Sequence, residues 1–373
     1  MIMLKNRNLK RLSFAVVMIL SLVTASCKKV EIAVPEVNVT PSAMTLEQVM
    51  VTCSNLASGV ESEVDYGDGT APVKVSGPFK LTHRYATDSS RKPGGVYNVL
   101  VKTGDHVVSK EVKVYPLLAL SALTYNMSQD GYDKVLLMAH RSNTTDMTIP
   151  ENSIAAVEAC IAAGVDFVET DTQITSDGYV VISHDQTIDR CTNGKGDITK
   201  MTLAQVKSYK LKDRNGKLTD QTIPTLEEFM EAAKGRIYVN LDYSPRSAST
   251  LDVMRVIRQT GTMEQTLFYI EGGDKGATKL KECLDLDPKT HVYVYRGQYT
   301  LLPGPGYFIQ AGYYPDQSAV NVSDPLKAGC LLTLNMLNGG TLDDLLKKYP
   351  DVRVIQSDIS NTLAKTLRGM GRR

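Results

Sequence analysis

The sequence has few aromatic residues, and its cysteines show no pairing pattern. It has no tryptophan and only 6 phenylalanines among 373 residues, so nothing in it indicates an aromatic platform on which sugars would stack. The cysteines after Cys27 are odd in number and scattered, without a CxxC pair or a histidine-rich partner segment: Cys53, Cys160, Cys191, Cys283 and Cys330. They therefore indicate neither a zinc site nor a disulfide framework. After the first 27 residues no apolar run approaches the ~20 residues that a transmembrane helix needs.

The first residues have the composition of an export signal. Four basic residues lie between positions 5 and 11, the apolar stretch LSFAVVMILSLVTA follows, and Ala25 and Ser26 precede Cys27. This arrangement resembles a bacterial lipoprotein signal, which implies cleavage after residue 26, acylation of Cys27 and a lipid-anchored, exported protein on the periplasmic or cell-surface face. An ordinary cleaved signal in which Cys27 is incidental is the alternative.

The net charge also excludes one class of partner. The whole chain has 42 Lys and Arg against 41 Asp and Glu, and removal of residues 1–26 takes away four basic residues, so the net charge moves from +1 to −3. A slightly acidic protein lacks the basic surface that nucleic-acid binding requires. We therefore expect no nucleic-acid partner, and the oligomeric state is left open.

Residues 27–115 contain short β-rich segments separated by turn residues, which favours a small β-sandwich. The segments VDYGDGT, HRYA and GGVYNVLVKT resemble a PKD domain, an immunoglobulin-like module that implies a spacer or adhesive role. Asp65, Asp68 and Thr70 are a candidate calcium loop, but further oxygen ligands are missing from their spacing. A turn held by aspartate side chains is the favoured interpretation. Residues 116–133 are expected to be a connector.

From residue 134 to 373 strand-sized apolar runs alternate with helical patterns. This alternation predicts a (β/α)8 TIM barrel, with an open doubly wound sheet as the alternative. No glycine-rich phosphate fingerprint follows a strand to support the open sheet. The expected strands lie near residues 135–139, 166–172, 179–184, 236–242, 266–270, 291–295, 330–335 and 352–357.

Polar residues stand where the first four of these strands end. A single one has an ordinary explanation as a capping or turn residue, but four successive strand ends favour a functional site, because barrel sites form at the carboxyl ends of strands. Glu169 and Asp171 are two positions apart and so face the same side of their strand, as half of a hard-cation site requires. The residues are His140, Arg141, Glu169, Asp171, His184, Asp185 and Asp242.

The segments AHRS, PENSIAAVEACIAAGVDFVETDTQITSDGYVVISHD and IPTLEEFMEAAKG resemble, in order, the glycerophosphodiester phosphodiesterase family. The resemblance implies a metal-dependent TIM-barrel hydrolase that converts glycerophosphodiesters to glycerol 3-phosphate and an alcohol. It also implies that His140 and His184 are the acid and base, that Arg141 binds phosphate, and that Glu169 and Asp171 hold Ca²⁺ or Mg²⁺.

Two positions depart from the family pattern. Ser142 replaces the usual glycine after His-Arg, and Asp242-Tyr243-Ser244 replaces a Glu-x-Lys motif at the end of the fourth expected strand. Asp242 is still able to ligate a metal. Ser244 occupies the substrate-binding position of the lysine without its charge, and Arg246 is a candidate substitute by proximity in the sequence. Glu151 has two open interpretations, a site residue or a favourable carboxylate at a helix N-terminus.

Three functions are consistent with these residues. The leading hypothesis is a lipid-anchored hydrolase of small glycerophosphodiesters. A phospholipase C- or D-like diesterase acting on a larger lipid is the second hypothesis, and an apolar rim at the barrel mouth would favour it. The third is a non-catalytic surface lipoprotein that binds carbohydrate or lipid, for which the loss of the lysine at Ser244 is the main support.

Overall fold

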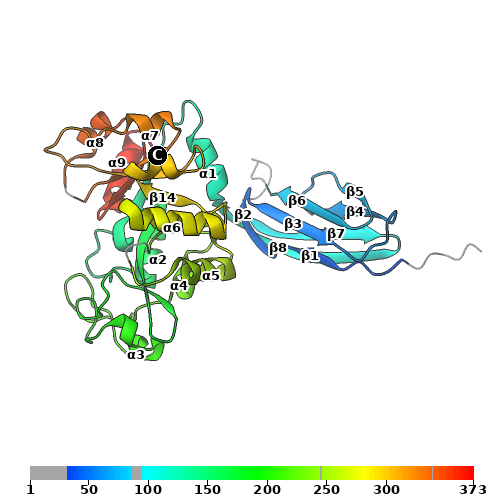
Figure 1. Ribbon diagram of the computed structural model, residues 1–373, viewed down its shortest axis with the longest axis horizontal. Helices are drawn as coiled ribbons and strands as arrows, with labels where there is room; N and C mark the ends of the chain where they lie inside the picture. The colour runs from blue at the N-terminus through cyan, green and yellow to red at the C-terminus, as the bar shows by residue number, and fades with distance from the viewer. Residues whose placement is uncertain (1–31, 86–93, 244–245, 338) are drawn as a thin grey trace, which may run out of the picture.

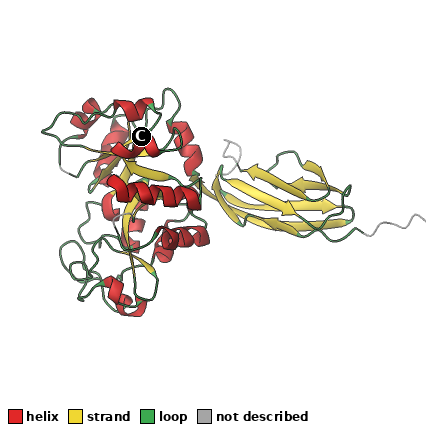
Figure 2. Cartoon of the chain, viewed as in Figure 1, coloured by secondary structure: helices red, strands yellow, loops and turns green. Residues whose placement is uncertain are grey.

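The computed structural model describes residues 32–85, 94–243, 246–337 and 339–373. Within these ranges an all-β N-terminal part precedes a larger part in which strands and helices alternate (Figures 1 and 2). Cys27 and Ser244 lie outside the described residues, as do the expected signal segment 1–26 and its apolar stretch. No described helix is long and apolar enough to cross a membrane.

The N-terminal part consists of two sheets that share one apolar core. Inward-facing residues of β3 and β7, such as Val51 and Val101, are fully buried, while their neighbours along the strand face solvent. This alternation is the two-residue period of a half-buried strand. Sheet order is β1-β3-β6 and β2-β8-β7-β4-β5. The strands are β1 (Val37–Val39), β2 (Ser42–Thr45), β3 (Gln48–Cys53), β4 (Glu61–Asp65), β5 (Val73–Ser76), β6 (Phe79–Arg84), β7 (Gly95–Thr103) and β8 (His106–Leu118).

The turn after β4 has the geometry that its aspartates suggest. Asp65 Oδ1 accepts the backbone N–H of Gly67 at 2.8 Å, and Asp68 Oδ1 accepts that of Thr70 at 3.0 Å. Gly67 has φ 73°, a value that glycine adopts without steric cost. These hydrogen bonds agree with the turn interpretation of this segment rather than with a calcium loop.

The second part is a closed barrel of parallel strands, as the alternating sequence pattern predicts. Strand β9 pairs with β10 on one side and with β17 on the other, which closes the sheet and excludes the open alternative. Every barrel strand is buried almost throughout, as parallel strands covered on both faces are. The barrel strands are β9 (Leu136–Ala139), β10 (Phe167–Ile174), β12 (Tyr238–Asp242), β13 (Thr266–Ile270), β14 (Val292–Tyr295), β15 (Phe308–Gly312), β16 (Leu331–Asn335) and β17 (Val352–Ser357).

The sequence-based strand list is wrong at one position and incomplete at another. The expected strand at 179–184 is β11 (Val180–Ile182), which pairs antiparallel with the end of β10 and is not part of the barrel. Strand β15 completes the barrel instead, and it was not predicted. A short apolar run such as Val-Val-Ile fits any buried strand, and the partner it pairs with is not encoded locally.

Helices cover the outside of the barrel, and several of them begin at a residue whose side chain caps the helix. Thr225 caps α4 in a capping box with Glu228, and Ser153 caps α2, which ends at Gly164 in the left-handed conformation. Their apolar faces pack on outward-facing strand residues, for example Phe229 near Val239 in one core cluster. The helices are α2 (Ile154–Ala163), α3 (Leu203–Lys207), α4 (Leu226–Ala233), α5 (Thr250–Thr260), α6 (Gly273–Leu286), α7 (Ser323–Lys327), α8 (Leu342–Lys348) and α9 (Ser360–Gly369).

The connector between the two parts contains a helix, α1 (Leu120–Met127), which lies where the β-rich part meets the barrel (Figure 1). Its residues Leu120, Leu123 and Met127 are buried against residues near the amino ends of the barrel strands, including Phe167 and Phe308. This helix therefore closes the amino end of the barrel with an apolar plug. The opposite, carboxyl end of the strands is left for the polar residues.

Candidate active site

A pocket of about 260 Å³ lies at the carboxyl ends of the barrel strands. Six of the residues singled out from the sequence, counting Arg246, line this pocket, and its described lining is polar. The lining residues are His140, Glu169, Asp171, His184, Asn240, Asp242, Arg246, Tyr269, Tyr293, Gln310, Asn335 and Gln356.

Three carboxylates meet in this pocket. Glu169 and Asp171 are on β10, and the parallel register of β10 with β12 places Asp242 directly beside Asp171. One oxygen of each side chain lies within 4.8 Å of the others. The sequence placed Asp242 at the end of the fourth strand, but β12 is the third strand along the barrel because β11 does not belong to it.

The three carboxylates repel one another in the metal-free protein. Burial, and then the negative charges of Asp171 and Asp242, raise the pKa of Glu169 well above its usual value. Burial, and then Asp171, raise the pKa of Asp242 to about 6. Desolvation and like charges both disfavour the ionised form, so the cluster favours any positive charge that is able to enter it.

Neighbouring residues hold the carboxylates in place by hydrogen bonds, and several of these residues have an unusual backbone conformation. Asn152 Nδ2 donates to Asp171 Oδ2 at 3.0 Å, and the backbone N–H of Arg141 donates to Glu169 Oε2 at 2.7 Å. Arg141, Ser142 and Asn152 all have φ between 50° and 57°, the left-handed region that non-glycine residues seldom adopt. Ser142 thus keeps the conformation for which glycine is best suited, and backbone strain of this kind is common at functional sites.

The chemistry of the cluster fits a hard divalent cation. All its ligand atoms are oxygens, and Asp242 Oδ1 and the neighbouring Asn240 Oδ1 are buried without a hydrogen-bond partner among the described residues. Ca²⁺ and Mg²⁺ prefer carboxylate and amide oxygens of this type. Glu169, Asp171 and Asp242 are the residues that would hold such an ion.

Both histidines of the pocket are paired with a carboxylate. His140 Nδ1 lies 3.0 Å from Asp358 Oδ1, and His184 Nδ1 lies 2.7 Å from Asp185 Oδ1. Burial alone would raise the pKa of Asp358, but the hydrogen bond with His140 and the charges of nearby groups lower it. Each pair orients its ring and leaves Nε2 as the nitrogen available to a substrate. His184 reaches the pocket from the loop after β11, not from a barrel strand.

Glu151 contacts two arginines beside the pocket. It precedes α2 and is separate from the carboxylate cluster, and its Oε1 lies 2.7 Å from Arg190 Nη2 and 3.5 Å from Arg141 Nη1. Arg190 Nε in turn lies 2.6 Å from Asp185 Oδ2. Glu151 therefore links Arg141 to the loop that carries the His184–Asp185 pair.

Part of the barrel that carries these residues matches a known protein family. Residues 140–261 match the model of the Glycerophosphoryl diester phosphodiesterase family. This match confirms the resemblance noted in the sequence for the first half of the barrel.

Relatives of this family cover part of the chain. It is 40% identical over 99 residues to a glycerophosphodiester phosphodiesterase of Caldanaerobacter subterraneus subsp. tengcongensis, which is 26% of this chain and 40% of that protein. It is 31% identical over 159 residues to glycerophosphodiester phosphodiesterase 1 of Mus musculus, 41% of this chain and 45% of that protein. The chain thus matches less than half the length of these curated relatives.

The fold has a solved counterpart. A crystal structure of a glycerophosphoryl diester phosphodiesterase from Parabacteroides distasonis superposes with a TM-score of 0.57, covering 68% of this chain and 92% of that one at 18% identity. At this identity the likeness supports the barrel fold alone.

At the position of the family's Glu-x-Lys motif the structure describes Tyr243 and Arg246 on either side of Ser244, which lies outside the described residues. Tyr243 is fully buried, with its ring edge-on to Phe268, so it faces the core and not the pocket. Arg246, three residues on, places its guanidinium in the pocket: Nη2 lies 2.5 Å from Asp171 Oδ1, and Nη1 donates to the carbonyl of His184 at 3.0 Å. The sequence offered Arg246 as a candidate, and the structure brings it to the carboxylates.

Several pocket residues were not identified from the sequence. Asp358 lies in the segment VIQSDIS directly after β17, so its position after a barrel strand was the available signal. Gln310, on β15, could not be found because its strand was not predicted. Asn335 is the last residue of β16 and Gln356 the last but one of β17, but single amides near strand ends carry little information on their own.

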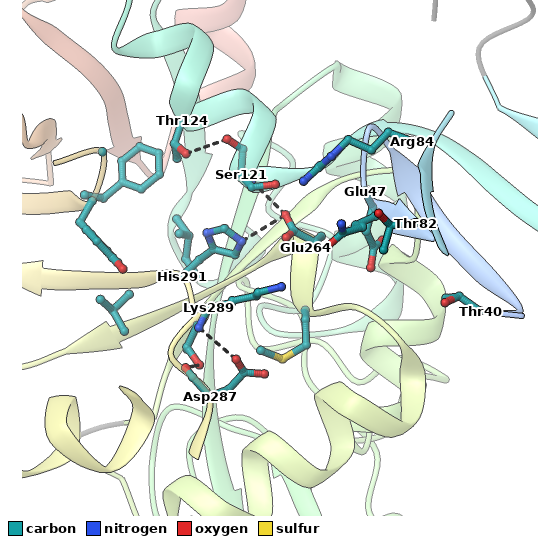
Figure 3. Close-up of a pocket in the computed structure, with 18 of the residues that line it drawn as sticks. Thr40, Glu47, Thr82, Arg84, Ser121, Thr124, Glu264, Asp287, Lys289 and His291 are labelled. Carbon is teal, nitrogen blue, oxygen red and sulfur yellow. Dashed lines mark hydrogen bonds and ion pairs between the residues drawn. The ribbon is translucent and has the colours of Figure 1, made fainter. Parts of the chain in front are cut away.

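A larger cavity, of about 640 Å³, lies at the other end of the barrel. Glu47, directly before β3, and Arg84 of β6 face it from the β-rich part, and Glu264 and His291 face it from the barrel (Figure 3). Glu264 Oε2 accepts the backbone N–H of Ser121 at 2.9 Å and lies 3.2 Å from His291 Nε2. These contacts join α1 to the barrel, and this cavity contains none of the carboxylate cluster.

Proposed function

We propose that the barrel is a divalent-metal-dependent hydrolase that converts glycerophosphodiesters to glycerol 3-phosphate and an alcohol, with Ca²⁺ or Mg²⁺ as the ion. One observation carries the proposal: a single pocket unites three clustered carboxylates with two histidines that each have a carboxylate partner. Metal-assisted phosphodiester cleavage needs a cation site beside an acid and a base.

The residues divide the chemistry between them. A divalent ion at Glu169, Asp171 and Asp242 would polarise a phosphoryl oxygen and offset charge in the transition state. Of His140 and His184, one takes a proton from the attacking hydroxyl or water, and the other gives a proton to the leaving alkoxide. Their carboxylate partners keep each ring in the orientation that this transfer needs.

Arg141 is proposed to bind a phosphate oxygen, as the family resemblance implies. Its Nε is buried without a partner among the described residues, and Nη1 is 3.5 Å from Glu151, which leaves donors of the guanidinium for an anion. A planar guanidinium is well suited to two parallel hydrogen bonds with phosphate.

The size and polarity of the pocket favour a small, polar substrate. Its volume of about 260 Å³ suits a glycerophosphate group, and no aliphatic side chain is among the described residues that line it. The described lining therefore does not support a phospholipase C- or D-like activity on a larger lipid. A small glycerophosphodiester is therefore the proposed substrate, and lipid cleavage is an outcome to be tested.

The remaining proposals concern the location of the protein. We propose an exported lipoprotein anchored through Cys27, with the two-sheet N-terminal part as a PKD-like spacer that holds the barrel away from the membrane. The composition of residues 1–27 supports the anchor. A Cys27→Ser variant should leave the membrane fraction, and retention there would contradict lipid anchoring.

Product release tests the activity. The purified mature protein is incubated with glycerophosphocholine, glycerophosphoethanolamine and a lysophospholipid, with Ca²⁺, Mg²⁺ or a chelator. The control is the His140→Ala/His184→Ala double variant. We expect glycerol 3-phosphate from the first two compounds with metal only. If the wild type releases no more than the double variant from any compound, the protein is not this hydrolase; release from the lipid alone would leave the mechanism and refute the substrate.

A further inference from the structure

Arg246 lies inside the carboxylate cluster and not beside it. Its Nη2 is 2.5 Å from Asp171 Oδ1 and 3.3 Å from Asp242 Oδ2, so it contacts two of the three residues that would hold a divalent ion. The side chain is largely buried, with 16% of its surface exposed. A guanidinium this close repels a divalent ion and takes up two of the carboxylate oxygens, so the two cations compete for the cluster.

The backbone of Arg246 is held, while the hydrogen-bonding capacity of its guanidinium is only partly used. The backbone N–H of Arg246 donates to the carbonyl of Tyr243 at 2.9 Å, and the next residue, Ser247, bonds through Oγ to Gln173 Oε1 at 2.6 Å. Ser247 Oγ also accepts the backbone N–H of Ile174 at 3.0 Å. Arg246 Nε, in contrast, is buried without a partner among the described residues. A rotation of the side chain alone therefore moves the guanidinium.

The charges in the pocket favour such a movement when a divalent ion and a phosphodiester are bound. When ionised, the three carboxylates carry three negative charges, and one divalent ion leaves a net negative charge facing a phosphodiester anion. Lysine is missing from the lining, and Arg246 is the one permanently charged cation among the described lining residues. A guanidinium released from Asp171 and Asp242 brings the charge to balance and offers a planar fork to phosphate.

We propose that Arg246 is an exchangeable counter-cation: it neutralises the carboxylates in the metal-free protein, is displaced by the divalent ion, and then binds the substrate phosphate. The phosphate step rests on the proposed function, whereas the displacement step does not. Two consequences follow. The guanidinium weakens metal binding in the absence of phosphate, and phosphate strengthens it, because phosphate draws the guanidinium off the carboxylates. Such linkage between two ligands is reciprocal.

Calorimetry on the chelator-stripped mature protein tests this inference. Mg²⁺ is titrated with and without inorganic phosphate into the wild type, Arg246→Gln and Arg246→Lys. The matched control is Arg236→Gln, which removes an arginine whose ion pair with Glu158 lies on the protein surface. We expect Arg246→Gln to bind Mg²⁺ about tenfold more tightly than the wild type, within the range of typical coupling, and to lose the enhancement by phosphate. Arg246→Lys, which keeps the charge, should fall between them.

The outcomes separate this inference from the proposed function. If Arg246→Gln is folded by thermal unfolding and binds Mg²⁺ no more tightly than the wild type, the displacement is refuted, even where the wild type cleaves diesters. If Arg246→Gln does not fold, Arg246→Lys decides in the same way. If displacement is observed but the wild type cleaves no diester, the exchange stands and the hydrolase proposal fails. Absence of Mg²⁺ binding in every variant refutes the inference.

Discussion

The charges of the carboxylate cluster should destabilise the metal-free protein. The Asp242→Asn variant, which removes one of these charges, tests this. The fold raises the pKa of Asp242 from its usual 3.8 to about 6, through burial first and the charge of Asp171 second. Below pH 3.8 the carboxyl is protonated in both the folded and the unfolded state. As the pH rises through 6, the folded state loses its proton at a cost that the unfolded chain does not bear, so stability is lost over this window.

The magnitude follows from the shift. A difference of about two pKa units at about 1.4 kcal/mol per unit corresponds to about 3 kcal/mol at pH 8. Asparagine has nearly the same shape and no charge, so it removes this cost. The pKa of about 6 already includes the opposing attraction of Arg246, whose Nη2 lies 3.3 Å from Asp242 Oδ2, so no further deduction is made for that pair. For a barrel of this size, a net gain of about 3 kcal/mol corresponds to a rise in Tm of about 6–12 °C.

The assay is thermal unfolding in chelator at pH 8 and at pH 4, on the wild type, Asp242→Asn and a control, Asp358→Asn. The control should change stability in the opposite direction, because the hydrogen bond with His140 and nearby charges outweigh burial and lower the pKa of Asp358. Its charged form stabilises the fold, so Asp358→Asn should lower Tm at pH 8. The reasoning is refuted if Asp242→Asn is less stable than the wild type at pH 8, or if its advantage persists unchanged at pH 4.

Three further outcomes are expected. His140→Ala and His184→Ala should each lower kcat by about 10²- to 10⁴-fold while Mg²⁺ binding by calorimetry is retained, and loss of binding instead would place the histidines in the metal site. Asp358→Asn should lower kcat by about 10- to 100-fold with little change in KM and should alter the pH profile, since Asp358 acts through His140; a changed KM at constant kcat would argue for a substrate contact. Leu120→Ala, in the buried plug of α1, should lower the free energy of unfolding by about 2–5 kcal/mol in urea, and a change under 1 kcal/mol would show that the plug is dispensable.

Local sequence patterns determined much of the barrel and part of its site. The alternating apolar segments indicated the (β/α)8 architecture, and the two-residue period placed Glu169 and Asp171 on one face of β10. The family motifs pointed to His140 and His184. Strand β15 was missed because its residues, Phe308 to Gly312, form a short run between loop residues with no distinct period. Strand β11 was misassigned because an apolar triplet does not specify its partner strand.

Tertiary structure alone decided how the site residues combine. The register between β10 and β12 brings Asp171 beside Asp242, and closure of the barrel brings Asp358 to His140 across 218 residues of sequence. Arg246 enters the cluster through a loop whose course depends on contacts with β10. Short-range periodicity encodes which face of a strand a side chain occupies, whereas the pairing of distant strands depends on the packing of the whole barrel. The sequence therefore indicated which residue types form the site, but it did not indicate which of them contact one another.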